Sequence, residues 1–261
     1  MTGSHNPNGV PDRILYVGTY AFGDKVPGAI TVLPFFQGRE NIGAPLQILP
    51  MVNPAFFWQH PCQPLLFVAN ESRGIPEFPE GTVSVCRISS DGRLGLVRCV
   101  PTGGTPCHLD GMKALLALAN YHGESVACFG LDASGDFSGH EQRIRHEGHG
   151  PNIKRQAGPH AHGIHVSPDE SFLVVPDLGT DELVFYRRGL PLLESCGALK
   201  IPGGTGPRHA AFHPLLPRLY LLTELSNEIF VIDGAPDRPA VTQAFSSLPS
   251  GFAGASHGAE I

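Results

Sequence analysis

The stretch FLVVPDLGTDELVFYRR, residues 172–188, contains two short apolar runs separated by a turn. The first run ends at Asp177, and the second alternates apolar and polar side chains. Runs of this length that are rich in β-branched and aromatic residues are typical of β-strands, and the Asp, Gly and Thr between them favour a turn. No helical periodicity is present. The stretch therefore predicts a pair of β-strands.

The same pattern occurs five times along the chain. Each copy is an apolar run with a polar residue at its sixth position, followed by a second, alternating apolar run. The first runs begin at Ile14, Leu65, Leu115, Phe172 and Leu219, and their polar residues are Thr19, Asn70, Asn120, Asp177 and Glu224. The copies recur about every fifty residues, which is typical of a repeat architecture. This interval leaves room for four strands, which make one blade of a β-propeller.

A second element precedes four of the strand pairs. Its copies are NPAFFWQHP (53–61), TPCHLD (105–110), PHAHGIHVSP (159–168) and GPRHAAFHP (206–214). In a propeller the first strand of each blade runs beside the central channel, so the residues that open this element should face a common axis. In this register Ala55, Cys107, His162 and Arg208 are equivalent. The side chains at this position differ from repeat to repeat, whereas the apolar residues around it are similar. This pattern indicates that the repeats form a scaffold and that this position contributes to a functional site.

The composition supports a folded, all-β chain. Of 261 residues, 41% are hydrophobic and 16% are charged, and 32 Gly and 25 Pro suit many tight turns. The net charge of −6 and the scattered basic residues argue against nucleic acid or a membrane surface as a partner. The polar first residues contain no signal-peptide core, no apolar run is long enough to span a bilayer, and the six cysteines form no CxxC pair. We therefore expect a cytoplasmic protein with free thiols.

Taken together, these motifs resemble the seven-bladed lactonase family, which includes propeller-type 6-phosphogluconolactonases and fungal carboxy-cis,cis-muconate cyclases. The resemblance covers nearly the whole chain: LYVGTY, NPAFFWQHP with VANE, PCH with LANY, PHAHGIHVSPDESFLVVPDLGTDEL, and GPRHAAFHP with LYLLTELSNEIFVI. It implies a β-propeller with an active site at one end of the channel. It also implies a catalytic His, Arg and Glu, which match His160, Arg208 and Glu224. We expect His162, His108 and His209 to contact the substrate.

The sequence differs from the family pattern in two places. The connection between His108 and Leu115 is short, which predicts a distorted third blade. The segment GASHGAEI, residues 254–261, falls where the next inner strand would begin. We therefore expect a single, incomplete and shortened propeller domain over residues 1–261, with about five blades and the start of a sixth. A further arginine that the family places beyond this point has no counterpart.

The resemblance implies hydrolysis of a sugar lactone in carbohydrate metabolism, as by a 6-phosphogluconolactonase. In this mechanism Glu224 or His160 takes a proton from water and Arg208 stabilises the oxyanion. An anionic small-molecule substrate would suit the locally concentrated positive charge. A muconate cyclase would use the same groups differently, and the sequence does not separate the two reactions.

Three further interpretations remain open. Glu224 could form an ion pair with Arg208 that has no catalytic role, and a shortened propeller could be a non-catalytic binding platform. A metal site around His108, His160, His162 and His209 is the third interpretation. However, no carboxylate or thiol accompanies the His-x-His pair at a spacing typical of metalloenzymes. We therefore expect neither a metal nor a cofactor.

Overall fold

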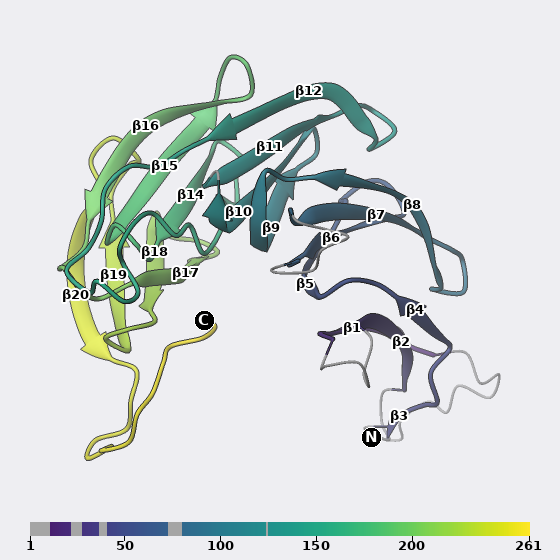
Figure 1. Ribbon diagram of the computed structural model, residues 1–261, viewed down its shortest axis with the longest axis horizontal. Helices are drawn as coiled ribbons and strands as arrows, with labels where there is room; N and C mark the ends of the chain where they lie inside the picture. Colours follow the sequence, from purple (N-terminus) through teal and green to yellow (C-terminus); the bar gives the residue numbers. More distant parts are fainter. Residues whose placement is uncertain (1–10, 22–27, 37–40, 73–79, 124) are drawn as a thin grey trace.

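The computed structural model describes residues 11–21, 28–36, 41–72, 80–123 and 125–261. These residues form twenty strands and no helix, so none of them belongs to a helix that could cross a membrane. The strands make five antiparallel sheets that follow one another along an arc in chain order (Figure 1). The all-β propeller architecture predicted from the repeat is confirmed, and each sheet is one blade.

Four of the blades have their strands in simple sequence order. The second blade contains β5 (Pro54–Gln59), β6 (Leu65–Asn70), β7 (Thr82–Ile88) and β8 (Leu94–Pro101). The third contains β9 (Gly104–Met112), β10 (Leu115–Gly123), β11 (Val126–Leu131) and β12 (Phe137–Ile144). The fourth contains β13 (His165–Val166), β14 (Phe172–Asp177), β15 (Glu182–Arg188) and β16 (Leu193–Lys200). The fifth contains β17 (Pro207–Phe212), β18 (Arg218–Thr223), β19 (Glu228–Asp233) and β20 (Ala240–Ser246).

The first blade is built differently. Its strands are β1 (Arg13–Thr19), β2 (Ala29–Phe36), β3 (Asn41–Ile42) and β4 (Gln47–Pro50). Strand β2 pairs with β1 on one side, and on the other side it pairs with both β3 and β4. By its sequence pattern β1 matches the second strands of the other blades. The described part of this blade therefore has no equivalent of the inner strands β5, β9 and β17.

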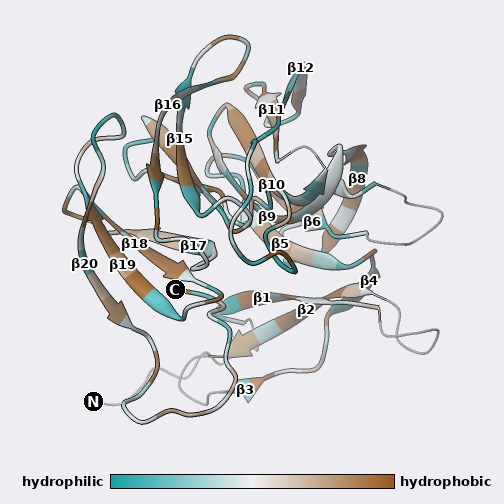
Figure 2. Ribbon diagram, turned by 60° about the vertical axis from the view of Figure 1, so that its left-hand side comes forward, coloured by the Kyte–Doolittle hydropathy of each residue, from teal (hydrophilic) through white to brown (hydrophobic). Residues whose placement is uncertain are grey.

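The core lies between neighbouring blades, because the faces of adjacent sheets pack on one another. Separate apolar clusters join the first blade to the second, the second to the third, the third to the fourth and the fourth to the fifth. Strands β6 and β11 are buried at every residue, whereas the outermost strand β20 is exposed along its whole length. Figure 2 shows apolar residues along the central strands and polar residues along many of the loops. This burial explains why the apolar runs in the middle of each repeat are so regular.

The pairing confirms one predicted register and corrects another. Ala55, Cys107 and Arg208 each lie at a break in the inner-strand pairing, and His162 follows the equivalent bridge between Ala161 and Asp177. We call these four positions the channel slot.

The expected register of Glu224 is wrong by one residue. Strand β18 begins at Arg218, whose guanidinium binds Asp233 at 2.7 Å, and it ends at Thr223. Thr223, and not Glu224, is therefore equivalent to Asn70, Asn120 and Asp177. Glu224 belongs to the next position, which we call the rim position and which holds Tyr20, Glu71, Tyr121, Leu178 and Glu224.

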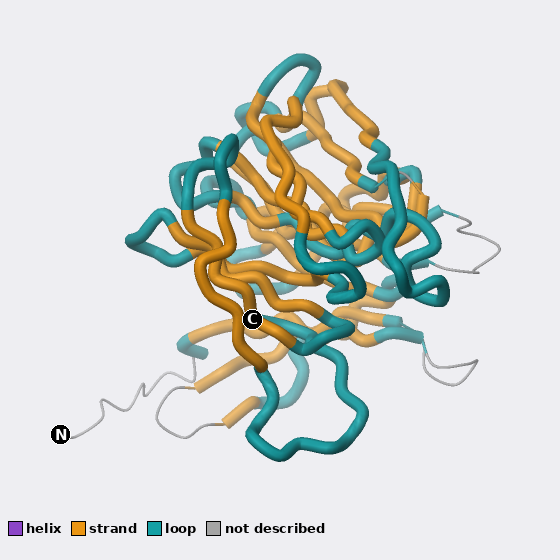
Figure 3. The backbone as a smooth tube through the Cα atoms, turned by 90° about the vertical axis from the view of Figure 1, so that its left-hand side faces the viewer, coloured by secondary structure: helices purple, strands orange, loops and turns teal. Residues whose placement is uncertain are grey.

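Two further expectations are not met. The third blade is regular in order, because β9 and β10 form a tight hairpin in which Met112 pairs with Leu115. The short connection is thus a tight turn between long strands. The start of a sixth blade is not formed as a strand: residues 247–261 carry none, and they return toward β17, where Glu260 contacts His209 (Figure 3).

In the second, third and fourth blades the polar residue at the end of the second strand anchors the loop that leads into the inner strand. Asn70 Nδ2 donates to the carbonyl of Val52 at 2.8 Å, and Asn120 Nδ2 donates to the carbonyl of Thr102 at 3.1 Å. Buried Asp177 uses its Oδ1 to accept from the backbone N–H of His160 at 2.8 Å. The polar residue of the repeat therefore holds the inner strand in place at the end of the channel.

Asp177 has the most partners of these anchors. Besides His160 N, its Oδ1 accepts from the backbone N–H groups of Gly179 at 2.9 Å and Thr180 at 3.2 Å. Its Oδ2 bonds to His146 Nδ1 at 2.7 Å, and His146 Nε2 bonds in turn to the hydroxyl of Tyr186 at 2.8 Å. A buried carboxylate without such partners would be strongly destabilising. The network therefore stabilises the turn and the inner segment of the fourth blade together.

We predict that Asp177→Ala lowers the free energy of unfolding by about 3 kcal/mol or more, because it leaves buried donors without an acceptor. Asp177→Asn should cost less, because its amide oxygen can still accept from the backbone. Urea denaturation of both variants measures the difference. The control is Asp237→Ala, which removes an exposed carboxylate and should change stability by no more than about 0.5 kcal/mol. Equal stability of Asp177→Ala and the control would contradict the anchoring role.

Candidate active site

Rim and channel-slot residues from all five blades line one cavity of about 650 Å³. The blades supply these residues in chain order, and the C-terminal segment adds two more. The lining consists of Tyr20, Ala55, Phe56, Glu71, Cys107, Tyr121, His122, Arg155, His162, Arg208, His209, Ala259 and Glu260. Charged groups and imidazoles make up much of this lining, which is the character of a polar binding site.

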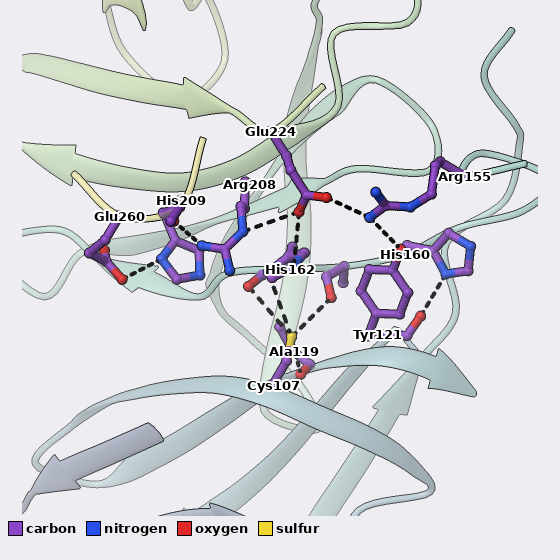
Figure 4. A network of polar contacts seen from close by, with 12 residues as sticks. Cys107, Ala119, Tyr121, Arg155, His160, His162, Arg208, His209, Glu224 and Glu260 are labelled. Carbon is purple, nitrogen blue, oxygen red and sulfur yellow. Dashed lines mark hydrogen bonds and ion pairs between the residues drawn. The ribbon is translucent and has the colours of Figure 1, made fainter. Parts of the chain in front are cut away.

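Glu224 lies between Arg155 and Arg208, two arginines that line this cavity (Figure 4). Its Oε1 accepts from Arg155 Nη2 at 2.6 Å, and its Oε2 accepts from Arg208 Nε at 3.2 Å. His162 Nε2 lies 3.6 Å from the same Oε2. The carboxylate is only 11% exposed, so these partners offset the cost of burying its charge. Both oxygens are thus occupied, and the two guanidinium groups are fixed side by side.

The floor of the cavity is formed by His162 and Cys107 from the channel slot. The Cys107 thiol lies 3.9 Å from His162 Nδ1 and contacts the carbonyl oxygens of Ala119, Ala161 and His162 (Figure 4). Burial raises the pKa of this thiol to about 12. Cys107 therefore stays protonated near neutral pH and is not an activated nucleophile.

Four imidazoles pack against one another at and below this floor: His162 and His209 line the cavity, and His108 and His165 lie beneath them. The ring centroids of His108 and His209 are 4.8 Å apart, those of His108 and His165 are also 4.8 Å apart, and those of His162 and His209 are 5.5 Å apart. Burial lowers the pKa of His162 and of His165 to about 3, with Arg208 and His209 respectively as further causes. Burial also lowers the pKa of His108 and of His209. The cluster is therefore uncharged at neutral pH.

Several nitrogens of this cluster are already used in hydrogen bonds. His108 Nδ1 accepts from the backbone N–H of Ile164 at 3.2 Å, and His165 Nε2 accepts from that of Ala210 at 3.0 Å. His209 Nδ1 bonds to Glu260 at 2.8 Å. In the part of the chain that the structure describes, no three His, Cys, Asp or Glu side chains form a group that could hold a metal ion.

The ring of Tyr121 lies against both histidines of the His-x-His pair, His160 and His162. It stacks on His160 with centroids 4.4 Å apart and meets His162 edge-on at 5.3 Å. His160 Nδ1 also bonds to the carbonyl of Tyr121 at 2.7 Å, and the Tyr121 hydroxyl accepts from Arg155 Nη2 at 3.2 Å. His160 therefore lies behind Tyr121 (Figure 4). Of these three aromatic residues, Tyr121 and His162 line the cavity and His160 does not.

The family model for the seven-bladed β-propeller lactonases matches residues 14–261. The chain belongs to this lactonase family. Because that match includes nearly the whole chain, the repeat and the cavity described above are those of a lactonase propeller.

Several similar proteins carry lactonase names. The lactonase chain is 29% identical to a 6-phosphogluconolactonase of Bacillus subtilis (strain 168), over 94% of this chain and 70% of that protein. It is 25% identical to a 6-phosphogluconolactonase of Erwinia tasmaniensis, over 90% of this chain and 63% of that protein. Of two uncharacterised staphylococcal relatives it spans 51% and 54% of the length.

Solved structures agree with this assignment. The Pseudomonas aeruginosa periplasmic gluconolactonase PpgL superposes with a TM-score of 0.82 at 28% identity, covering 94% of the lactonase chain and 70% of PpgL. A putative 6-phosphogluconolactonase from Bacteroides fragilis has a TM-score of 0.80 at 25% identity, covering 91% of this chain and 68% of that one. The described blades therefore follow the course of established lactonase propellers.

The lactonase structure brings together some of the residues predicted to form the site. Arg208, His162 and His209 line the cavity, and Glu224 contacts Arg208 and His162 from behind this lining. His160 and His108 do not line the cavity: His160 is screened by Tyr121, and His108 is buried under the floor, 4% exposed. The catalytic role assigned to His160 and the substrate-binding role assigned to His108 have no direct geometric support here.

The sequence analysis missed five further residues of the site: Tyr20, Glu71, Tyr121, Arg155 and Glu260. Three of them, Tyr20, Glu71 and Tyr121, share the rim position with Glu224. The repeat therefore contained the information needed to find them, but Glu224 had been aligned with Asn70 and Asn120, one residue earlier, and the rim position was overlooked. Arg155 lies in a long connection outside the repeat, and Glu260 comes from the C-terminal segment. No repeat pattern marks these two residues.

We predict that the lactonase loses stability in mild acid because of the buried histidines. The pKa of each is lower in the folded state than the unfolded value of 6.5, so protons bind preferentially to the unfolded chain as the pH falls. The contribution of these histidines to the free energy of unfolding should be nearly constant above about pH 7.5. It should then fall toward pH 4 by up to about 1.4 kcal/mol per pH unit for each histidine.

Urea denaturation at pH 7, 6 and 5 measures this dependence. In a His165→Gln variant the free energy of unfolding should depend less steeply on pH, by up to about 1.4 kcal/mol per pH unit, because one histidine no longer takes up a proton on unfolding. The matched His140→Gln variant, which changes an exposed histidine on β12, should keep the full slope. A flat profile for the unaltered chain between pH 7 and 5 would contradict the prediction.

Proposed function

We propose that this chain hydrolyses a sugar δ-lactone of the 6-phosphogluconolactone type. Membership of the lactonase family supports the reaction class. Similarity to proteins named 6-phosphogluconolactonase and gluconolactonase supports a sugar lactone as the substrate. The observation that carries the proposal is the pair of guanidinium groups that Glu224 fixes at the wall of the polar cavity.

The arginine pair is suited to negative charge on the substrate. Arg155 and Arg208 carry two positive charges against the single charge of Glu224, and each bond to Glu224 uses only one nitrogen of its guanidinium group. Arg208 Nη1 also donates to the carbonyl oxygen of Ala259, and Arg155 Nη2 also donates to the Tyr121 hydroxyl. The N–H groups that are not used in these bonds can donate to a phosphate or to a carbonyl oxygen, because a guanidinium group presents five donors. We infer that the lactone binds with its anionic or carbonyl end against this wall.

Ester hydrolysis requires the stabilisation of an oxyanion. When water adds to the lactone carbonyl, the carbonyl oxygen gains a full negative charge, and fixed donors lower the barrier most effectively when they need no reorganisation. The bonds to Glu224 and Tyr121 hold the Arg155 guanidinium before any substrate arrives. The site is thereby organised for acyl transfer to water.

The cytoplasmic location and the role in carbohydrate metabolism remain predictions, as does the muconate substrate of the alternative reaction. A cyclase would also need an anion-binding wall, because its substrate carries several carboxylates. Parallel incubation with 6-phosphogluconolactone, gluconolactone and carboxy-cis,cis-muconate therefore assigns the reaction.

We predict that Arg208→Leu and Arg155→Leu each lower kcat/KM for the lactone about 10²- to 10³-fold, because each removes fixed positive charge from the oxyanion or the substrate anion. The assay follows lactone loss with both the phosphorylated and the unphosphorylated sugar. A loss confined to the phosphorylated substrate would place the arginine on the phosphate, and an equal loss would place it on the oxyanion.

The matched control for these variants is Arg187→Leu, which removes an exposed arginine paired with Glu194 far from the cavity lining. This variant should retain full activity. Full activity of both Arg155→Leu and Arg208→Leu would overturn the proposed role of the wall. A wild-type chain without lactonase activity would overturn the proposed function itself.

A further inference from the structure

Two carboxylates occupy equivalent rim positions around the cavity. Glu224 follows β18 in the fifth blade, and Glu71 follows β6 in the second. The backbone N–H of each donates to the loop before its inner strand, Glu224 to the carbonyl of Gly206 at 2.8 Å and Glu71 to that of Asn53 at 3.0 Å. The two side chains differ in their surroundings, and this difference indicates different roles.

Glu224 is poorly placed to accept a proton from water. Both of its oxygens are bonded to guanidinium groups, and His162 also approaches Oε2. Protonation would leave the side chains of Arg155 and Arg208 in a partly buried site without their counter-ion. Glu224 therefore serves as the shared counter-ion of the two arginines, and both of its oxygens are already bonded.

Glu71 has the opposite environment. Its Oε2 accepts from the Tyr20 hydroxyl at 2.6 Å, and among the described residues no cation pairs with its carboxylate. Both residues line the cavity, Glu71 partly buried and Tyr20 48% exposed. One carboxylate oxygen of Glu71 is therefore available to a water molecule in the cavity.

The backbone of Glu71 is held in place by hydrogen bonds to Asn53. Asn53 Nδ2 donates to the carbonyl of Glu71 at 2.9 Å, and Asn53 Oδ1 accepts from the backbone N–H of Ala21 at 2.9 Å. Asn53 has a φ of 31°, in a region that asparagine tolerates better than most residues. These bonds tie the rims of the first and second blades together, so Tyr20 and Glu71 are held as a pair.

We propose that Glu71, oriented by Tyr20, is the general base of lactone hydrolysis, and that Glu224 is a positioning residue that holds the two arginines. The inference rests on the proposed lactonase function. In this assignment Tyr20 and Glu71, from the first and second blades, carry out the proton transfer. Arg208 from the fifth blade and Arg155 from the connection before the fourth blade stabilise the negative charge.

The proton balance of the reaction follows directly. The Glu71 carboxylate takes a proton from water while the water oxygen forms a bond to the lactone carbonyl carbon, and the carbonyl electrons move to its oxygen. The tetrahedral intermediate then collapses, the bond to the ring oxygen breaks, and protonated Glu71 returns the proton to that oxygen. One lactone and one water give one hydroxy acid, and Glu71 is regenerated.

Tyr20 acts as the hydrogen-bond donor in this pair. Burial, followed by the hydrogen bond to Glu71, raises the pKa of the Tyr20 hydroxyl above its usual value. The hydroxyl therefore remains protonated and continues to orient the carboxylate at neutral pH.

The test compares Glu71→Gln, Glu71→Asp and Glu224→Gln in steady-state hydrolysis of 6-phosphogluconolactone across pH. Lactonase activity of the unaltered chain is established first. Circular dichroism and urea denaturation confirm that each variant is folded. We expect Glu71→Gln to lower kcat about 10²- to 10⁴-fold with little change in KM, and to abolish the acidic limb of the pH–kcat profile. Glu71→Asp keeps a carboxylate and should retain that limb at a lower kcat.

Glu224→Gln should instead raise KM and retain the acidic limb, because it disturbs the arginines and not the base. Glu141→Gln, on the exposed face of β12, is the matched control and should leave kcat unchanged. A folded Glu71→Gln variant with wild-type kcat, or loss of the acidic limb in Glu224→Gln alone, would overturn the assignment while leaving the lactonase function intact. An inactive unaltered chain would overturn both.

Discussion

The hydrogen bond from the end of the second strand to the loop before the inner strand, present in the second, third and fourth blades, is the constraint on which the site depends. Asn70, Asn120 and Asp177 occupy the same place in successive blades and fix the chain that enters the inner strand. Once this loop is fixed, the channel slot and the rim position of each blade have defined directions. The blades then supply groups to one cavity, although these groups are far apart in the sequence.

The chemistry of the cavity comes from the variation at these two positions. The channel slot holds a methyl group, a thiol, an imidazole and a guanidinium group in successive blades, and the rim position holds two phenols and two carboxylates in four of the five. Apart from Cys107, which packs against the cluster between the third and fourth blades, none of these side chains belongs to the apolar clusters between the sheets. The electrostatic balance is set by the contact of Glu224 with Arg155 and Arg208, which compensates a buried charge and fixes two donors.

The sequence predicted the repeat, the propeller and the channel slot, because all three depend on local patterns of apolar residues and turns. It placed Glu224 one residue out of register because β18 begins with Arg218, a charged residue that forms an ion pair with Asp233 and so conceals the start of the strand. The prediction for His160 came from the family motif and could not include the ring of Tyr121, which comes from the adjacent blade. Arg155 belongs to no repeat, so only the folded chain brings it to Glu224.

The packing between blades has a consequence for the cavity. Each pair of neighbouring sheets is joined by its own apolar cluster, and the lining residues on opposite walls belong to different sheets. The aperture of the cavity is therefore set by the angles between sheets, and so by the volumes of side chains such as Phe67, Leu116 and Leu173, which are fully buried. Exchanges of bulk at these remote sites offer a route to new substrate sizes without any alteration of the polar groups.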